Sequence, residues 1–287
     1  MAYTVEDSFT QFIKNISISC DLSDAVETRT NLAIDLLSKK FDILEIFPTG
    51  SLLTYTTLKK YTTIDIVVVL HYSKYIKNKE PIDLFRIVKK TLSAYNTKIT
   101  KKNKHAITLI FKKAPHVNII PASRVLDGDK FSHYNIPSID KDIWIASNPK
   151  IHTQNMREFN IYKSKLVQII KEWNLNNSSY LSSFHIDNIA LSYEEEVNSD
   201  FSWHVCKFFK HMYDKIEKKF PNPNGLGSFV DDYLDNYTRE EVLKLIDETI
   251  TLTYDAWYEI YSDKSHKLSI ETYCECFGER FPKYGKS

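Results

Sequence analysis

Two apolar segments of this 287-residue chain carry isolated polar side chains that could do chemistry. Thr63 and Asp65 begin an otherwise apolar run that ends at Leu70, and Asn118 lies between Val117 and Ile119. Because alternate residues of a strand point to one face, Thr63 and Asp65 are predicted to share a face. A buried carboxylate is costly without a partner, so Asp65 is predicted to face a functional cleft. The alternatives are a cap or salt bridge for Asp65 and an edge-strand hydrogen bond for Asn118.

Gly50-Ser51 is a candidate phosphate-binding turn. It follows a short strand predicted over residues 43–47, and residues 51–59 are expected to form a helix. Glycine permits a close backbone approach, and the first N–H groups of a helix attract anions. The Ser51 hydroxyl adds a donor, so the turn suits a triphosphate. An ordinary helix cap is the alternative.

The order of the remaining elements predicts two lobes. Residues 1–150 are expected to form an α/β lobe with an N-terminal helix, and residues 151–287 a helical lobe that completes a nucleotide cleft. The predicted fold class is therefore α+β, a mixed sheet with helices followed by helices alone. The segment 126–150 is expected to be an irregular crossing that can include a strand over residues 142–146. The expected strands are 43–47, 64–71, 99–100, 106–111 and 116–121, and the expected helices are 5–40 with a break near 17–23, 83–95, 152–173, 179–194, 201–217, 239–260 and 266–277.

Composition limits the class of protein. Apolar residues make up 43% of the chain, and 38 Lys and Arg nearly balance 37 Asp and Glu, so a dedicated non-specific nucleic-acid binder is not expected. The basic turn around Lys101 and Lys102 could contact nucleic acid, although a solvated hairpin is favoured. The four cysteines are expected to be reduced thiols. No secretory signal and no apolar run of about 20 residues is visible, which predicts a soluble, cytoplasmic protein without membrane contact.

Several segments, taken in order, resemble the bacterial cyclic-oligonucleotide synthases known as the CD-NTase group. These enzymes are related to cyclic GMP-AMP synthase and oligoadenylate synthase and have a polymerase-β-like nucleotidyltransferase lobe. The family often has Gly-Thr where this chain has Tyr55-Thr56. The matching segments are Gly50-Ser51, Thr63-Ile64-Asp65-Ile66, residues 106–111, residues 116–122, residues 148–152, residues 166–174, Ser182-Ser183-Phe184-His185 and residues 276–282.

The resemblance implies a role for several residues. Gly50 and Ser51 would contact the donor phosphates, Lys171 and Ser183 would hold the triphosphate from the helical lobe, and Phe184 would stack on a base. The alternatives are helix caps for Ser51 and Ser183, a solvated lysine for Lys171 and a core position for Phe184. Trp173 is assigned to the core.

The departures from the family concern the metal ligands. In this family three carboxylates hold two Mg²⁺ ions, which activate the attacking hydroxyl and neutralise the phosphates. Thr63 and Asn118 occupy two of those positions, so Asp65 is the sole retained acid. Magnesium prefers anionic oxygen ligands, so Asp65 with the phosphates of a nucleoside triphosphate could hold one Mg²⁺ but not support two-metal catalysis at ordinary rates.

The resulting hypothesis is a catalytically impaired CD-NTase-like protein of antiphage, CBASS-type signalling. It would bind a nucleoside triphosphate, an oligonucleotide or nucleic acid, with RNA or a protein as regulator. One alternative is an active Mg²⁺-dependent nucleotidyltransferase that makes a cyclic or linear oligonucleotide messenger. The other is a non-catalytic scaffold or partner of an active synthase or effector.

Overall fold

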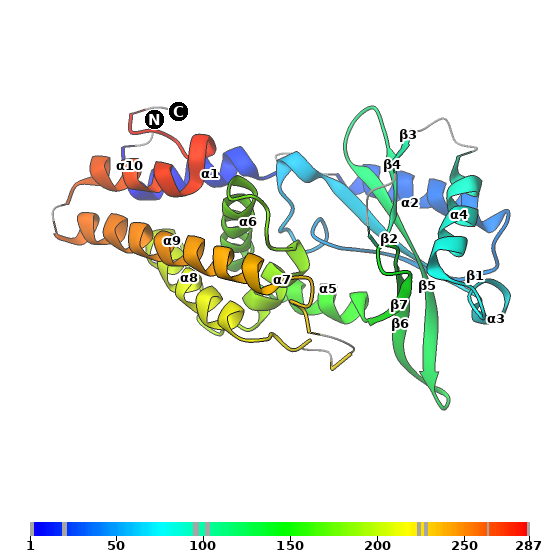
Figure 1. The fold of residues 1–287 in the computed structure, drawn as a ribbon. Helices are drawn as coiled ribbons and strands as arrows, with labels where there is room; N and C mark the ends of the chain where they lie inside the picture. The colour runs from blue at the N-terminus through cyan, green and yellow to red at the C-terminus, as the bar shows by residue number, and fades with distance from the viewer. Residues whose placement is uncertain are drawn as a thin grey trace. The chain divides into compact units, whose positions relative to one another are not determined.

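A computed structural model describes most of the chain, and its contacts divide the chain into two compact units (Figure 1). The sheet unit comprises Cys20–Thr54 and Tyr61–Gln154, and the helical unit comprises Met1–Ser19, Tyr55–Lys60 and Asn155–Ser287. The described residues are 3–18, 22–93, 98–100, 104–222, 225–226, 229–262 and 264–285. Lys101 and Lys102 of the basic turn lie outside them.

The first helix, α1 (Val5–Ile16), belongs to the helical unit, whereas the sequence analysis placed it in the α/β lobe. Its apolar face carries Val5, Phe9, Phe12 and Ile16, and these side chains are buried in the core of the helical unit. Periodicity identifies the apolar face of such a helix but does not say which unit covers it. The observed units therefore differ from a division at residue 150.

The sheet unit is built on a mixed sheet that is seven-stranded within the described residues. The central strands β2 (Thr63–Leu70) and β5 (His116–Asp127) are parallel, and the other pairings are antiparallel. The main path runs β1-β2-β5-β4-β3, with β6 on β5 and β7 on β6. The remaining strands are β1 (Ile43–Thr49), β3 (Lys98–Thr100), β4 (Ile107–Ile110), β6 (Lys130–Ser138) and β7 (Ile143–Ser147), and the helices are α2 (Ser23–Ser38), α3 (Tyr72–Tyr75) and α4 (Pro81–Leu92).

The predicted irregular crossing at 126–150 is wrong for most of its length, whereas the strand considered over residues 142–146 is present as β7. The end of β5 forms a hairpin with β6 through Gly128, whose φ is +60°, and β7 extends that part of the sheet. Glycine adopts this left-handed conformation at little cost, which allows the tight turn. Local composition suggested a loop because the hairpin strands are only partly apolar.

The two faces of β2 differ in what covers them. Ile64, Ile66, Val68 and Leu70 are buried in one core with residues of α2 and α4. The alternate residues Val67 and Val69 belong to a smaller cluster with Ala122 and Tyr134. Asp65 shares this second face, as the alternation of a strand requires.

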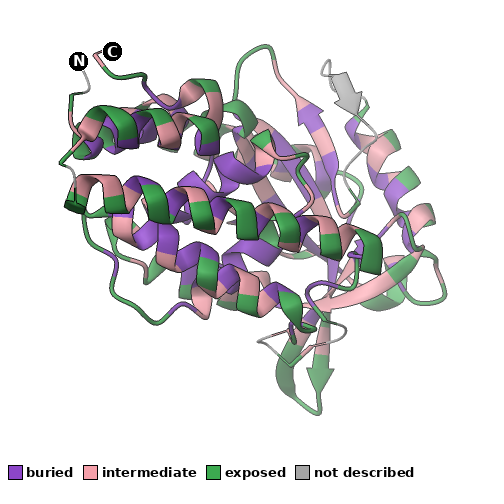
Figure 2. Cartoon of the chain, turned by 60° about the vertical axis from the view of Figure 1, so that its left-hand side comes forward, coloured by how far each residue is buried: buried purple, intermediate pink, exposed green. Residues whose placement is uncertain are grey.

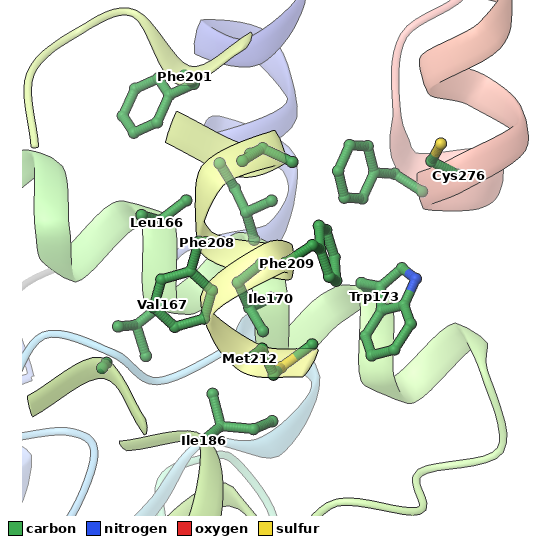
Figure 3. Close-up of a cluster of buried hydrophobic side chains, with 14 of the residues drawn as sticks. Leu166, Val167, Ile170, Trp173, Ile186, Phe201, Phe208, Phe209, Met212 and Cys276 are labelled. Atoms are coloured by element: carbon green, nitrogen blue, oxygen red, sulfur yellow. The ribbon is translucent and has the colours of Figure 1, made fainter. Parts of the chain in front are cut away.

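The helical unit packs its long helices around one aromatic-rich core (Figures 2 and 3). Trp173 is 2% exposed, as expected for a core residue, and its ring meets Phe209 with 4.9 Å between ring centroids (Figure 3). The helix expected over 152–173 is two helices, because Asn160 caps a new helix by accepting from the Lys163 N–H. The helices are α5 (Pro149–Arg157), α6 (Ile161–Asn176), α7 (Ser183–Leu191), α8 (Phe201–Glu217), α9 (Asn236–Ser262) and α10 (His266–Phe277), with η1 (Lys59–Tyr61) and η2 (Gly278–Arg280) as single 3₁₀ turns. Within the described part of the chain, none of the helices is both long enough and apolar enough to cross a bilayer.

Candidate functional site

A row of polar residues crosses four neighbouring strands of the sheet unit. The strand register places Thr49 of β1 opposite Asp65 of β2, Asp65 opposite Asn118 of β5, and Asn118 opposite Thr108 of β4. The Asn118 side-chain amide donates from Nδ2 to Oδ1 of Asp65 over 2.7 Å. The Thr108 hydroxyl donates to Oδ1 of Asn118, also over 2.7 Å. Asn118, which the family resemblance grouped with Asp65, therefore lies beside it.

The direction of these hydrogen bonds follows from the chemistry of the groups. An ionised carboxylate can only accept, so the NH₂ group of Asn118 must face Asp65. The amide oxygen then faces Thr108, whose hydroxyl can donate. Asn118 is 7% exposed and is bonded on both sides of its amide, which is what a buried polar group requires. The row therefore carries one negative charge, on Asp65, with a neutral donor beside it.

Thr63 lies at the start of β2, two residues before Asp65 and hence on the same face of the strand. Its register partner on β5 is His116, and this pair lies two residues along the strands from the pair formed by Asp65 and Asn118. The structure thus places Thr63, Asp65 and Asn118, the three positions that the family resemblance matches to carboxylates, on two neighbouring strands. Two of these positions hold neutral side chains.

Gly50 lies directly against the carboxylate of Asp65. A Cβ atom added at Gly50 would lie 2.1 Å from Oδ2 of Asp65, far inside any contact distance. The φ of Gly50 is +87°, a conformation that side chains other than glycine rarely adopt. The expected close backbone approach at Gly50 therefore exists, and the group approached is Asp65.

The helix expected over residues 51–59 is absent; that segment, fully described, consists of turns followed by extended chain and the start of η1. The Leu53 N–H donates to the Gly50 carbonyl over 3.1 Å, and the Thr54 hydroxyl donates to the Ser51 carbonyl over 3.2 Å. Side chains of α6 hold the chain that follows this turn, since Gln168 donates to the Thr57 carbonyl. Ser51 therefore does not begin a helix, and the attraction of anions to a helix N-terminus does not apply to it.

Tyr55 lies in the left-handed region, with a φ of +58°. This is the position at which the related family often has glycine. Left-handed backbone costs about 1 kcal/mol for a residue with a side chain. The backbone at Tyr55 thus adopts a conformation that glycine favours.

Lys171 is buried within the helical unit and is not a solvated lysine. Its Nζ lies 2.7 Å from Oδ1 of Asp187 on α7 and donates to the Thr56 hydroxyl over 3.0 Å. The Lys171 side chain is only 6% exposed and that of Asp187 10%. The sequence analysis missed Asp187, although its place four residues after Ser183 puts both on one face of a helix.

Ser183 and Phe184 begin α7 and are both exposed. Ser182, and not Ser183, caps the helix by accepting from the His185 N–H over 3.2 Å. Phe184 is 40% exposed, so the alternative that it is a core residue is wrong. An exposed ring at a helix start can stack on a base.

A hydrogen-bond network that includes the buried His185 supports the start of α7. The Tyr233 hydroxyl accepts from the Ser182 N–H over 2.9 Å and forms a second hydrogen bond of 3.0 Å with Nδ1 of His185. Burial lowers the pKa of His185 to about 4, and nearby Asp231 offsets only part of this effect. His185 is therefore neutral near pH 7.

The donor set around Asp65 does not fit a pair of Mg²⁺ ions. Magnesium takes oxygen ligands, preferably charged ones, and Asp65 is the one carboxylate among the three matched positions. The hydrogens of the Asn118 amide face Oδ1 of Asp65, so Asn118 presents a donor there and not the lone pair that a metal ligand requires. Among the described residues, no group of three or more His, Cys, Asp or Glu side chains could hold a metal ion.

Comparison with solved structures identifies the fold. The chain superposes on Escherichia coli MS115-1 CdnC solved with ATP, with a TM-score of 0.76 at 15% identity over 98% of this chain and 99% of that one. The CD-NTase CdnG of Bradyrhizobium diazoefficiens, solved with GTP, gives a TM-score of 0.73 at 14% identity over 96% and 94% of the two chains. These matches confirm the predicted fold, that of the polymerase-β-like CD-NTases.

The sequence itself identifies the family. Residues 3–160 match the model of the Second Messenger Oligonucleotide or Dinucleotide Synthetase domain, and the chain belongs to this family. A probable cyclic nucleotide synthase of Bacillus cereus (strain VD146) is 28% identical over 164 residues, which cover 53% of this chain. The match spans about half, 47%, of the length of that relative.

Proposed function

We propose that this chain binds a nucleoside triphosphate at the Gly50 turn and the polar row, and that it transfers nucleotidyl groups much more slowly than a relative with three carboxylates. One observation carries the proposal: the Asn118 amide donates to Asp65 over 2.7 Å. A hydrogen-bond donor is thus present where a second carboxylate would hold a metal ion. Asn118 also cannot serve as a base toward an attacking hydroxyl.

The metal ions of this reaction do two things that neutral side chains do not replace. They generate the attacking oxygen nucleophile, and they neutralise the charge that the phosphates develop. With one carboxylate, Asp65 and the triphosphate oxygens would hold a single Mg²⁺. Binding then depends on the groups that contact the phosphates and the base, for which we propose Gly50, Ser51 and the α6 and α7 residues Lys171, Ser183 and Phe184.

An active synthase is the second candidate. It is favoured by membership of the synthetase family and by the relative described as a probable cyclic nucleotide synthase. Its product would be a cyclic or linear oligonucleotide, made with Asp65 as the essential acid. We further propose a role in CBASS-type antiphage signalling with a protein or RNA regulator; the Escherichia coli MS115-1 CdnC, which shares this fold, was solved in complex with a HORMA protein.

The test uses the wild-type chain, the double variant Thr63→Asp with Asn118→Asp, and Asp65→Asn. Each is incubated with radiolabelled ATP and GTP plus Mg²⁺ or Mn²⁺, and nucleotide binding is followed by thermal shift. We expect the wild type to bind without appreciable product and the double variant to gain about 10²-fold or more in rate.

Wild-type product that equals that of the double variant and is lost in Asp65→Asn would establish the active synthase instead. Absence of any nucleotide-dependent shift in wild type would support the non-catalytic partner role.

A further inference from the structure

The helical unit contains a cavity that the nucleotidyltransferase site does not use. Its volume is about 430 Å³, within the range typical of small-molecule sites. Four segments line it: the start of α1, the residues leading into α8, the end of α9 and the start of α10. All of these segments lie in the helical unit. Among the residues that the structure describes, the cavity therefore shares no lining residue with the polar row of the sheet unit.

Aromatic rings form much of the lining. Phe9 and Phe201 are buried, with 6.1 Å between their centroids, and they provide an apolar floor. Trp257 and Tyr261 stack with 5.5 Å between centroids and an interplanar angle of 19°. Tyr261 is 76% exposed, which is unusual for a ring that lines a cavity. A half-buried tryptophan stacked on an exposed tyrosine beside an apolar floor is typical of a binding site.

The charge of the lining has one sign. Glu6 and Asp200 contribute carboxylates, and none of the described residues that line the cavity is lysine or arginine. Asp200 caps α8 through Oδ1, which accepts from the Trp203 N–H and from the Ser202 hydroxyl. The His266 ring is oriented by the Val5 N–H, which donates to its Nδ1 over 3.4 Å.

The helix starts around the cavity supply an opposing effect, since a helix N-terminus attracts anions. Each of the three starts already has its own cap: Thr4 for α1, Asp200 for α8 and Ser265 for α10 accept backbone N–H groups. Two full negative charges therefore outweigh the remaining partial positive charge. Cations also bind favourably over the face of a tryptophan or tyrosine ring.

We propose that this cavity binds a small organic ammonium cation, held over Trp257 and Tyr261 and paired with Glu6 and Asp200. This site would be additional to the nucleotide site and does not depend on whether the chain is catalytic. The aromatic rings supply cation–π contacts and the carboxylates supply charge-assisted hydrogen bonds to any N–H group of the ligand.

The test is isothermal titration of the full chain with spermidine and, separately, with choline. The ionic strength is matched with NaCl. Spermidine offers primary and secondary ammonium groups, whereas choline offers a quaternary one, so the pair distinguishes hydrogen-bonded from purely cation–π recognition. The variants are Glu6→Gln, Asp200→Asn, which keeps a capping side chain, and Tyr261→Ala. The matched controls are Glu240→Gln and Tyr237→Ala, two exposed residues of α9 that do not line the cavity.

We expect saturable binding of at least one probe at one site, weakened about tenfold by each cavity variant and unchanged by either control. Circular dichroism and the unfolding midpoint show that each variant is folded. The proposal is overturned if neither probe binds saturably below 10 mM, which is roughly the weakest affinity that such contacts would give. Equal binding to the cavity and control variants would overturn it as well.

Discussion

Replacing Asn118 with aspartate restores the carboxylate of the related family and is the sharpest perturbation of the polar row. The Asn118 amide lies 2.7 Å from Asp65, so Asn118→Asp brings two carboxylates into contact at a site that is 7% exposed. Two like charges about 4 Å apart repel by about 4 kcal/mol at an effective dielectric constant of 20. The substitution also removes a hydrogen bond to a charged group, worth about 1.5–3 kcal/mol.

Protonation limits the total cost. The new carboxyl group escapes the repulsion by taking up a proton, at about 1.36 kcal/mol per pH unit between its unfolded pKa of about 3.9 and the solution pH. The cost is therefore about 4 kcal/mol at pH 7 and about 1.5 kcal/mol at pH 5. The sign follows from a folded-state pKa that is raised: the variant is least impaired below pH 4, where a neutral carboxyl can donate to Asp65 as the amide does.

The assay is urea unfolding of wild type and Asn118→Asp at pH 5 and pH 7, with and without millimolar Mg²⁺. The expected result is a deficit that grows with pH and that Mg²⁺ reduces, because a cation between two carboxylates replaces the amide hydrogens. Asn155→Asp, an exposed change on α5, is the control and should leave stability nearly unaltered. A variant as stable as wild type at both pH values, and indifferent to Mg²⁺, would refute the assignment of this hydrogen bond.

Three further predictions concern Gly50, Lys171 and His185. Gly50→Ala should lower the free energy of unfolding by more than about 2 kcal/mol, since the new Cβ meets Asp65. Gly128→Ala, with open space around it, should lower it by only about 1 kcal/mol through backbone strain. The midpoints of urea unfolding compare the two variants. Asp187→Ala should destabilise the protein by about 3–5 kcal/mol because it leaves the Lys171 ammonium buried without its ion pair. Adding Lys171→Met should recover much of that loss, and thermal unfolding measures both variants. An Asp187→Ala variant as stable as wild type would contradict this. Burial holds the pKa of His185 at about 4, below its ordinary 6.5. The contribution of neutral His185 to the free energy of unfolding is present above pH 6.5 and should fall by about 3 kcal/mol as the pH drops toward 4. In His185→Gln, the unfolding free energy measured against pH should lose this decrease.

Much of the sheet unit was predictable from local pattern. The alternation in β2 assigned Ile64 and Ile66 to one face and Asp65 to the other, and both assignments agree with the structure. Alternation alone left open what Asn118 faces; the family resemblance grouped it with Asp65, and the parallel register of β2 and β5 places the two residues opposite each other. The resemblance to the family then indicated that these are positions of metal ligands.

Other features depended on partners distant in the sequence. The helix predicted after Gly50 does not form, because Thr56 and Thr57 bond to Lys171 and Gln168 more than 100 residues away. The alternative of a solvated Lys171 is wrong because its side chain is buried beside Asp187, a residue 16 positions further along the chain. Helical propensity is a weak preference, and contacts of this kind override it.

Residue type and spacing were thus enough to predict which faces are apolar and which strands carry Asp65 and Asn118. The folded chain decided which surface covers each face, in which direction the Asn118 amide points, and that a cavity with aromatic walls forms where three helices begin. The physical reason is the range of the forces involved. Backbone geometry and side-chain alternation act over a few residues, whereas burial and hydrogen-bond pairing depend on which distant segments meet.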